Sequence, residues 1–262
     1  MIGTNSISRK KIIIFDLDGT LAKSKSNLDK EMATLISKLL QHRYVAVTSG
    51  CSFHQFENQF LSRLPKRTNL RNLFLFPTCS ASGHYYNPKR GRFYRAYSNL
   101  LPKHAAMRIV HSFEIVFKKI DYVQPEKTYG RVFENRGSQL TFSALGQNAP
   151  LHLKQKWDPQ QKKRLEIRKL LKAYMPDYEI SIGGTTSIDV TRKSVNKTLC
   201  VKKLKQRLGV DRRDMLYIGD ALFPGGNDYI MKSTGIKCIS VSAPDQTKTL
   251  IRRIVENDSD MQ

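Results

Sequence analysis

The sequence predicts an α/β fold, in which a parallel sheet flanked by helices is interrupted by an inserted α+β segment. Three observations support this class. Apolar runs of strand length alternate with helix-like segments near the start of the chain, and the same rhythm returns from residue 194 onward. Between residues 84 and 190, strand-like runs follow one another more directly. Because strands that alternate with helices form parallel sheets with right-handed crossovers, both ends of the chain are expected to share one sheet.

The first segment of the chain has the pattern strand, helix, strand, helix, strand. Its helix candidates have apolar residues at helical spacing and begin after residues that cap helices well. The carboxyl ends of parallel strands meet at one edge of the sheet, where open α/β sheets bind ligands. The candidates are a strand over 11–15, a helix over 28–41 capped by Asn27, a strand over 44–49, a helix capped by Ser52, and a strand over 73–76 that stops at Pro77.

The middle of the chain, residues 84–190, is interpreted as a cap domain of α+β type over the edge of the sheet. The core domain then comprises residues 1–83 and 191–262. The expected elements of the cap are a hairpin over 85–94, a helix over 102–119, strands over 130–134, 139–143, 178–182 and 187–190, and a basic helix over 159–174.

The last segment returns to the alternating pattern and completes a discontinuous, Rossmann-like core. The expected elements are a helix over 195–208, a strand over 215–218, a glycine-rich loop to Gly226, a helix over 227–233, a strand over 236–241 and a helix over 244–255.

The composition is that of a soluble globular protein, with 40% hydrophobic and 26% charged residues among 262. No apolar run approaches the ~20 residues that cross a bilayer, so no membrane partner is expected. The polar N-terminus lacks the apolar core of a signal peptide. Four widely spaced cysteines form no C-x-x-C pair, which argues against a zinc site and a disulfide framework. We therefore expect a cytoplasmic protein, and a homodimer is compatible with these features.

The charge is unusual, with 45 Lys and Arg against 22 Asp and Glu and a formal net charge of +23. Such a field attracts polyanions and phosphorylated metabolites. The basic clusters are spread over the chain, and the tyrosines form no obvious stacking ladder. Nucleic-acid association is therefore a secondary hypothesis, beside a merely basic surface.

The most informative motif is the end of the first strand, where Asp16 and Asp18 are followed by Gly19 and Thr20. A strand end holds carboxylates rigidly, so that one can attack an electrophile while the other carries protons. On its own, Asp-x-Asp-Gly-Thr also fits a surface turn. Its interpretation depends on whether the other parts of a catalytic site follow.

A second motif supplies those parts, because the strand over 215–218 ends in Gly219-Asp220 and a glycine-rich turn carries Asn227-Asp228. Carboxylates at the ends of two neighbouring strands can share a hard cation, and Mg²⁺ prefers oxygen ligands. We expect Asp16 and Asp220 as direct ligands and the Asp18 carbonyl as a third. Either Asn227 or Asp228 completes the set, with Asp228 slightly favoured.

Two smaller features fit a bound phosphoryl group. Ser49, with Thr48 as the alternative, lies at the second strand end, where its hydroxyl and the amides of Gly50 and Cys51 could bind phosphoryl oxygens. Lys197 precedes the strand over 215–218, and its ammonium could offset the charge of the nucleophile and the phosphoryl group.

The order of these motifs closely resembles the haloacid dehalogenase (HAD) superfamily, whose Mg²⁺-dependent members transfer phosphoryl groups through an aspartyl-phosphate. The resemblance implies that Asp16 attacks phosphorus and that Asp18 protonates the leaving alkoxide and then activates the acceptor. A water acceptor gives a phosphatase, and a sugar hydroxyl gives a mutase.

Segments 134–146, 181–190 and 219–228 narrow the resemblance to the eukaryotic-type phosphomannomutase branch, over about residues 11–254. In that branch the cap binds the sugar phosphate. The resemblance implies substrate contacts from Arg136, Ser181, Gly183 and Asp189.

The sequence also departs from the branch at three cationic positions. Gln147 stands where the branch has a phosphate-binding arginine, and lysine replaces arginine at Lys154 and Lys25. Lysine keeps the charge but loses the bidentate fork of arginine. Because a mutase must bind a phosphate at either end of its substrate, these changes harm a mutase more than a phosphatase.

The sequence therefore favours a Mg²⁺-dependent phosphatase, a hydrolase that acts on a sugar phosphate or a similar small phosphorylated metabolite. A phosphomannomutase, which interconverts mannose 6-phosphate and mannose 1-phosphate, is the first alternative. A basic nucleic-acid-associated protein with an idle HAD core is the second.

Overall fold

The computed structural model describes residues 10–24 and 26–259. The chain divides into two compact units. Unit 1 contains the residues up to Tyr97 and those from Lys197 onward, and unit 2 is Ser98–Asn196. Each unit has a sheet and a hydrophobic core of its own.

Unit 1 is built on a seven-stranded sheet in the order β11-β10-β1-β2-β3-β4-β5. Neighbouring strands from β11 to β3 are parallel, and β4 is antiparallel to β3. The fold class expected from the alternating pattern is thus confirmed. The strands are β1 (Ile12–Asp16), β2 (Tyr44–Thr48), β3 (Leu73–Phe76), β4 (Ser82–Asn87), β5 (Arg92–Ser98), β10 (Met215–Gly219) and β11 (Lys237–Ser240).

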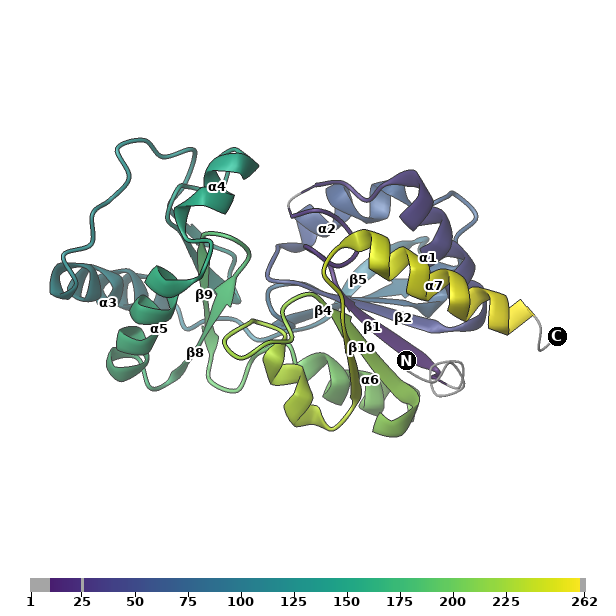
Figure 1. Cartoon of the computed structure of the whole chain (residues 1–262). Coiled ribbons are helices and arrows are strands. Elements are labelled where there is room, and N and C mark those ends of the chain that lie inside the picture. The colour runs from purple at the N-terminus through teal and green to yellow at the C-terminus, as the bar shows by residue number, and fades with distance from the viewer. Residues whose placement is uncertain (1–9, 25, 260–262) are drawn as a thin grey trace. The chain divides into compact units, whose positions relative to one another are not determined.

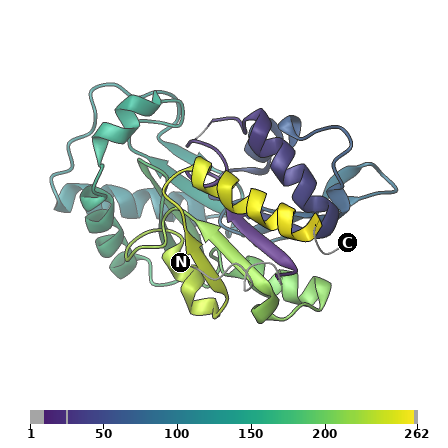
Figure 2. The same ribbon diagram turned by 45° about the vertical axis from the view of Figure 1, so that its right-hand side comes forward.

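Helices cover both faces of this sheet, as Figure 1 shows. On one face lie α1 (Lys30–His42), α2 (Phe53–Gln59) and α7 (Pro244–Ser259), and on the other lie α6 (Leu199–Leu208) and the 3-10 helix η5 (Tyr229–Thr234). Figures 1 and 2 agree that α1 and α7 run side by side. Shorter 3-10 turns are η2 (Leu61–Arg63), η3 (Leu70–Asn72) and η4 (Arg212–Asp214).

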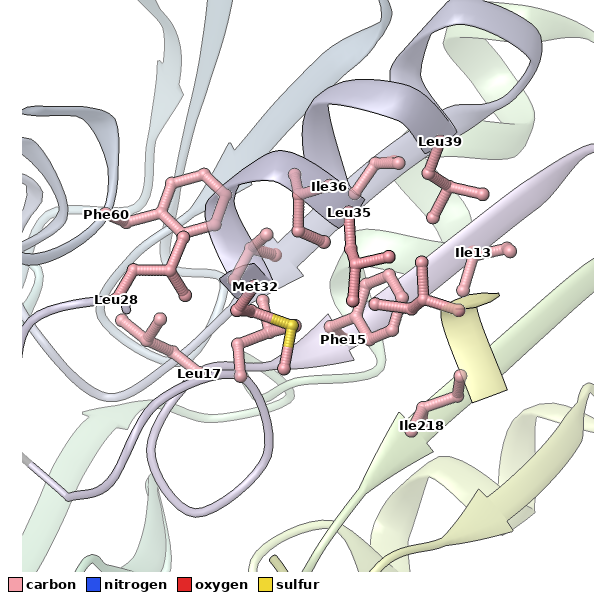
Figure 3. Close-up of a cluster of buried hydrophobic side chains, with 14 of the residues drawn as sticks. Ile13, Phe15, Leu17, Leu28, Met32, Leu35, Ile36, Leu39, Phe60 and Ile218 are labelled. Carbon is pink, nitrogen blue, oxygen red and sulfur yellow. The ribbon is translucent and has the colours of Figure 1, made fainter. Parts of the chain in front are cut away.

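The alternation of side chains along β1 explains this layering. Ile13 and Phe15 pack among the side chains of α1, α2 and α7, a cluster drawn in Figure 3. Ile12 and Ile14 point to the opposite face and pack against α6 and η5. Because all four side chains are fully buried, β1 must be a central strand, which fixes the position of the residues that follow it.

Two helix starts in unit 1 rest on capping side chains. Ser52 caps α2 as expected, in a capping box with Gln55. α1 begins later than expected, and its cap is Asp29, whose carboxylate accepts from the amide of Met32 at 2.9 Å. Asn27 was the wrong cap because Leu28 is buried and its amide donates to Gln59 O, which holds this segment outside the helix.

Unit 2 has a four-stranded antiparallel sheet in the order β6-β7-β9-β8, with helices packed on one of its faces. Leu140, Phe142, Ile188 and Val190 point toward these helices. The elements are α3 (Ala105–Lys119), β6 (Phe133–Asn135), β7 (Gln139–Ser143), α4 (Leu151–Trp157), α5 (Lys162–Tyr174), β8 (Tyr178–Gly183) and β9 (Ser187–Arg192).

The hairpin expected over 85–94 was placed in the wrong unit. β4 pairs with β3, with Tyr85 opposite Phe74 and His84 opposite Leu75, so the hairpin extends the sheet of unit 1. The boundaries therefore lie at residues 98 and 196 rather than at 84 and 190. Backbone pairing to β3 decides this, and the hairpin sequence alone does not reveal its partner strand.

Two expected helices of unit 1 also differ from those observed, and one observed helix of unit 2 was not expected. The helix expected from residue 195 begins at Leu199, and the one expected from Asn227 is a 3-10 helix that begins at Tyr229. The separate helix α4 was not expected. Among the described residues, no helix is both long enough and apolar enough to cross a membrane.

Candidate active site

The candidate site of unit 1 lies at the carboxyl ends of two neighbouring parallel strands. Asp16 is the last residue of β1, and Asp220 directly follows β10. The two strands pair from Ile12 opposite Met215 to Phe15 opposite Ile218, so these residues emerge at the same edge. The loop after β10 returns Asp228 to this position, and its amide donates to Ala221 O.

Two glycines allow the carboxylates to come close to the backbone. Gly19 has a φ of +88°, and a Cβ atom there would lie 2.5 Å from Asp220 Oδ2. A Cβ atom at Gly219 would similarly collide with Asp228 Oδ2. Any larger residue at either position would push a carboxylate away, so the glycines of both motifs are required by packing.

Lys197 joins the two loops. Its ammonium donates to Asp16 Oδ1 at 2.5 Å and to Asp228 Oδ1 at 2.6 Å, and Asn227 Oδ1 lies at 3.5 Å. Lys197, Asp16 and Asp228 are all buried. Sequence analysis anticipated a role for Lys197 in balancing charge, and the structure brings it into direct contact with Asp16.

The remaining contacts orient Asp228 and Asp220. The hydroxyl of Tyr217 donates to Asp228 Oδ1 at 2.5 Å, and the amide of Ala221 donates to Asp228 Oδ2 at 3.1 Å. The hydroxyl of Thr20 donates to Asp220 Oδ1 at 3.3 Å. Tyr217 and Thr20 were not among the predicted site residues. Thr20 lies in the first motif, whereas Tyr217 reads as an ordinary strand residue.

The donor set suits a hard divalent cation. Asp16, Asp220 and Asp228 each offer an oxygen, and these oxygens lie within 4.8 Å of one another. Among the described residues, these three carboxylates face one ammonium, that of Lys197, so this ionised group carries excess negative charge. Because Mg²⁺ favours carboxylate oxygens and tolerates few protein ligands, these residues fit it.

The excess negative charge also raises pKa values in this group. Burial raises the pKa of Asp16 well above its ordinary value, and the carboxylates of Asp228 and Asp220 add to the effect, which Lys197 only partly offsets. Burial and Asp228 raise the pKa of Asp220 to about 6. Burial alone would lower the pKa of Lys197, but Asp16 and Asp228 outweigh it and raise that pKa. A bound cation would supply the missing positive charge.

The expected phosphate-binding loop follows β2, next to β1. Thr48 lies opposite Asp16 in the sheet, and its hydroxyl is 3.0 Å from the hydroxyl of Ser80. Ser49 is buried, and its Oγ accepts from the amide of Cys51 at 3.2 Å. The Cys51 amide, which was expected to bind a phosphoryl oxygen, donates to Ser49 Oγ in this arrangement, and its role in phosphate binding stays a prediction. Gly50, between them, is half-buried.

Two further residues were predicted for the site. Asp18 is half-buried in the turn after β1, where it bridges to Ala22. Lys25, expected to contact substrate, lies outside the described residues.

Unit 2 has a polar row on the sheet face opposite its helices. Thr141 of β7, Asp189 of β9 and Ser181 of β8 lie opposite one another across three neighbouring strands. Asp189 Oδ1 accepts from Thr141 Oγ1 at 2.7 Å and from Gln139 Nε2 at 2.8 Å. A Cβ atom at Gly183 would lie 2.5 Å from Asp189 Oδ2, so Gly183 makes room for this carboxylate.

The next row includes hydroxyls that sequence analysis missed. Ser143 lies opposite Ser187, which in turn lies opposite Gly183. The hydroxyls of Ser143 and Ser187 are 2.8 Å apart, and Ser143 Oγ accepts from Gln147 Nε2 at 2.9 Å. Polar and apolar residues alternate in β7 and β9, and this pattern could have predicted a polar sheet face. It does not predict the register between the two strands, which decides that Ser143 lies opposite Ser187.

The cations expected to contact substrate in unit 2 have protein partners. The guanidinium of Arg136 donates to Glu134 Oε2 from Nε at 3.0 Å and from a terminal nitrogen at 2.6 Å. Arg136 also donates to Gln147 Oε1 at 3.4 Å. The ammonium of Lys154, which is buried, donates to Gln147 O at 2.8 Å. Gln147 thus connects both cations.

Comparison with known proteins places these features in context. A family model described as eukaryotic phosphomannomutase matches residues 32–257. A phosphomannomutase of Encephalitozoon cuniculi is 24% identical over 250 residues, covering 91% of both chains. Human phosphomannomutase 1 is 23% identical over 264 residues, covering 97% of both.

Solved structures give the same fold class. A truncated IMP-nucleotidase of Plasmodium falciparum aligns with a TM-score of 0.70 at 18% identity, covering 96% of this chain and 72% of that one. A trehalose-6-phosphate phosphatase of Aspergillus fumigatus aligns with a TM-score of 0.55 at 16% identity, covering 98% of both. These likenesses support the α/β fold of HAD type.

Proposed function

This chain belongs to the eukaryotic phosphomannomutase family, a branch of the HAD phosphotransferases, and from this we propose that it is a Mg²⁺-dependent phosphomutase that interconverts mannose 6-phosphate and mannose 1-phosphate. One observation carries the proposal: Asp16, Asp220, Asp228 and Lys197 form one buried or half-buried group at the sheet edge of unit 1. The sequence alone favoured a phosphatase over a phosphomannomutase. The relatives are named phosphomannomutases, which supports the mutase instead. An idle core is disfavoured because the acidic group is intact.

In the proposed reaction, Asp16 is the nucleophile. One of its carboxylate oxygens forms a bond to phosphorus as the bond from phosphorus to the departing sugar oxygen breaks, which leaves an aspartyl-phosphate. Asp18 protonates that oxygen and then accepts the proton of the attacking hydroxyl. Lys197 stays within reach of Asp16 and stabilises the transferred group electrostatically.

Mg²⁺ would be held by Asp16, Asp220 and Asp228, with the Asp18 carbonyl as a further ligand, and would draw charge from the phosphoryl oxygens. Tyr217 and Thr20 orient two of these carboxylates through the hydrogen bonds described above. The raised pKa values of Asp16 and Asp220 support this role, since a cation would favour their ionised forms.

For unit 2 we assign the sugar-binding role to the polar face of its sheet. Hydroxyl and carboxylate groups in rows suit a polyhydroxyl ligand, because each sugar hydroxyl can both donate and accept a hydrogen bond. Asp189, Ser181 and Ser187 are the proposed contacts, with Gly183 providing space. Arg136 is the proposed phosphate contact of this unit, and Lys154 supports it through Gln147.

A phosphatase that acts on a small phosphorylated sugar is the second candidate, and one observation favours it. Glu134 already forms an ion pair with Arg136. In addition, Gln147 is uncharged where the resemblance to the family implies an arginine. A mutase must keep the phosphorylated sugar bound so that its hydroxyl, and not water, attacks the aspartyl-phosphate. If unit 2 binds the sugar's other phosphate weakly, hydrolysis of the aspartyl-phosphate becomes more frequent. The two candidates share the nucleophile and differ in the acceptor.

The test supplies mannose 1-phosphate with Mg²⁺ and a hexose bisphosphate activator, and measures mannose 6-phosphate and inorganic phosphate together. The mutase predicts isomerisation with little phosphate release, and a Gln147→Arg variant should raise the ratio of isomerisation to hydrolysis. Hydrolysis without isomerisation would refute the mutase. Asp16→Asn should reduce either activity by about 10⁴-fold or more, as expected for loss of a covalent nucleophile. Full turnover in that variant would refute the covalent route.

A further inference from the structure

One surface of unit 1 is strongly basic and is not used by the proposed reaction. It is formed by the hairpin of β4 and β5 and by α6. Residues 82–98 and 199–208 together carry eight lysines and arginines and no aspartate or glutamate. β5 is the edge strand of the seven-stranded sheet, and its residues are exposed or half-buried.

Contacts between cations and aromatic rings bring the two segments together. The ammonium of Lys203 lies over the ring of Tyr97, 4.8 Å from its centre. The guanidinium of Arg207 lies over the ring of Tyr85 at 5.8 Å. Tyr97 fits because Gly83 has no side chain, since a Cβ atom there would collide with the tyrosine ring. Each contact holds a cation of α6 against the hairpin.

An exposed tyrosine lies beside these pairs. The ring of Tyr94 packs edge-on against Tyr85, with 6.2 Å between ring centres, and 39% of Tyr94 is exposed. Arg92 is two residues away on the same strand and therefore shares its face. Lys89 and Arg90, at the tip of the hairpin, are exposed. The resulting basic face consists of Lys89, Arg90, Arg92, Tyr94, Lys203 and Arg207.

We propose that this basic face binds single-stranded nucleic acid. Cations from two elements would contact successive phosphates, and the Tyr94 ring offers a flat surface on which one base can stack. A row of cations alone would also suit a membrane or any other polyanion, but a partly exposed ring among arginines favours a chain of phosphates and bases. The net charge of +23 would add long-range attraction. This binding does not depend on the proposed mutase activity.

The test measures fluorescence anisotropy of a labelled oligouridine of about twelve nucleotides, a length that falls within known site sizes. The variant carries Arg90→Gln, Arg92→Gln and Arg207→Gln. The control variant carries Arg63→Gln, Arg67→Gln and Arg71→Gln, three exposed arginines elsewhere in unit 1. Both variants lose the same charge. Circular dichroism and phosphotransfer activity check that both remain folded.

We expect the first variant to bind the oligonucleotide about tenfold more weakly near 0.15 M salt. The slope of log K against log salt concentration should also become shallower by about 2, because each of the three lost phosphate contacts contributes roughly 0.7. The control variant should bind nearly as the unaltered protein does. Tyr94→Ala should weaken binding to the single strand more than to a duplex, because only unpaired bases can stack.

Other results would overturn the proposal. Equal weakening in both variants would show that binding reflects total charge. Unchanged binding in the first variant, or no binding near physiological salt, would remove the surface as a site. Binding of anionic phospholipid vesicles but not of the oligonucleotide would assign the face to membranes instead.

Discussion

His84 is a buried histidine that packs against the helix following the expected phosphate-binding loop. Its ring stacks on Phe53, the first residue of α2, with 3.8 Å between ring centres and 9° between planes. Burial, with a smaller contribution from Arg95, lowers the pKa of His84 to about 4. The histidine is therefore neutral in the folded protein at pH values where an unfolded chain is already protonated.

This difference predicts a loss of stability in mild acid. The unfolded state binds a proton below its pKa near 6.5, whereas the folded state does not until about pH 4, so the free energy of unfolding falls as pH drops between these values. His84→Phe keeps the stack on Phe53 but cannot be protonated. We expect this variant to lose about 1 kcal/mol less free energy of unfolding between pH 7 and pH 5 than the unaltered protein. This figure is smaller than the full pKa shift implies, because His84 is partly accessible to solvent. Urea unfolding followed by circular dichroism at the two pH values measures it. Identical pH profiles for both proteins would contradict the prediction.

At the residue scale, the site residues that could be predicted from the sequence are those at the ends of strands. Asp16 and Asp220 follow apolar runs, so their shared edge could be predicted. Lys197 was predicted only by its place before β10. Its contact with Asp228 depends on how the glycine-rich loop returns, and no spacing rule gives that path. Likewise Ser187 meets Ser143 only because of the register between β7 and β9.

At the scale of elements, one buried arginine connects α5 to the turn between β8 and β9. Arg164 is 2% exposed. Its Nε donates to Asp158 Oδ2 at 2.9 Å, and a terminal nitrogen donates to Gly184 O at 2.7 Å and to Gly183 O at 3.3 Å. The arginine thus holds the turn that carries Gly183, beside the proposed sugar contact Asp189.

We predict that Arg164→Met destabilises unit 2 by about 3 kcal/mol. The buried Asp158 carboxylate loses its counter-charge and keeps the amides of residues 163 and 164 as donors, and the carbonyls of Gly183 and Gly184 lose the guanidinium. Trp157, the only tryptophan in the chain, lies in unit 2, so its fluorescence during urea unfolding reports on this unit alone. Lys169→Met, at an exposed position of the same helix, is the matched control and should change little. A loss below 1 kcal/mol in Arg164→Met would show that the contacts do not constrain the turn.

The elements that were misplaced share one physical cause. The hairpin over 85–94 has the same local pattern whether it pairs with β3 or with a strand of unit 2. Only tertiary pairing distinguishes these outcomes, and it moved the boundary to residue 98. By contrast, β7 was predicted with the bounds observed because its apolar residues alternate with polar ones over a full strand.

At the scale of the whole molecule, a buried ion pair joins distant parts of the chain within unit 1. Arg43, at the end of α1, forms a bidentate pair with Asp258 near the end of α7, and its guanidinium also donates to Lys10 O. Both side chains of the pair are below 10% exposed. Residues near both ends of the described chain therefore depend on one guanidinium.

A second ionic cluster links α1 and α7 at the surface. Lys248 lies within 3.2 Å of carboxylate oxygens of Asp29, Glu31 and Asp245, whose side chains are about half exposed or more. The two ionic contacts thus join the same helices, and they differ mainly in the exposure of their carboxylates. Comparing the Arg43 pair with the Lys248 cluster therefore measures the energetic effect of burial within one protein. Both contacts also offset part of the excess positive charge, whose repulsion opposes folding.

We predict that Asp258→Asn lowers the free energy of unfolding of unit 1 by about 3 kcal/mol, because it leaves a buried guanidinium without its counter-charge. Lys248→Gln should lower it by about 1 kcal/mol or less, because water screens the carboxylates that Lys248 contacts. Hydrogen exchange of the α7 and β1 amides measures both. The double variant Arg43→Met, Asp258→Leu should recover most of the loss, since it removes both charges from the buried site. If the double variant is as unstable as Asp258→Asn, the loss arises from altered packing at the end of α7 and not from an unpaired charge.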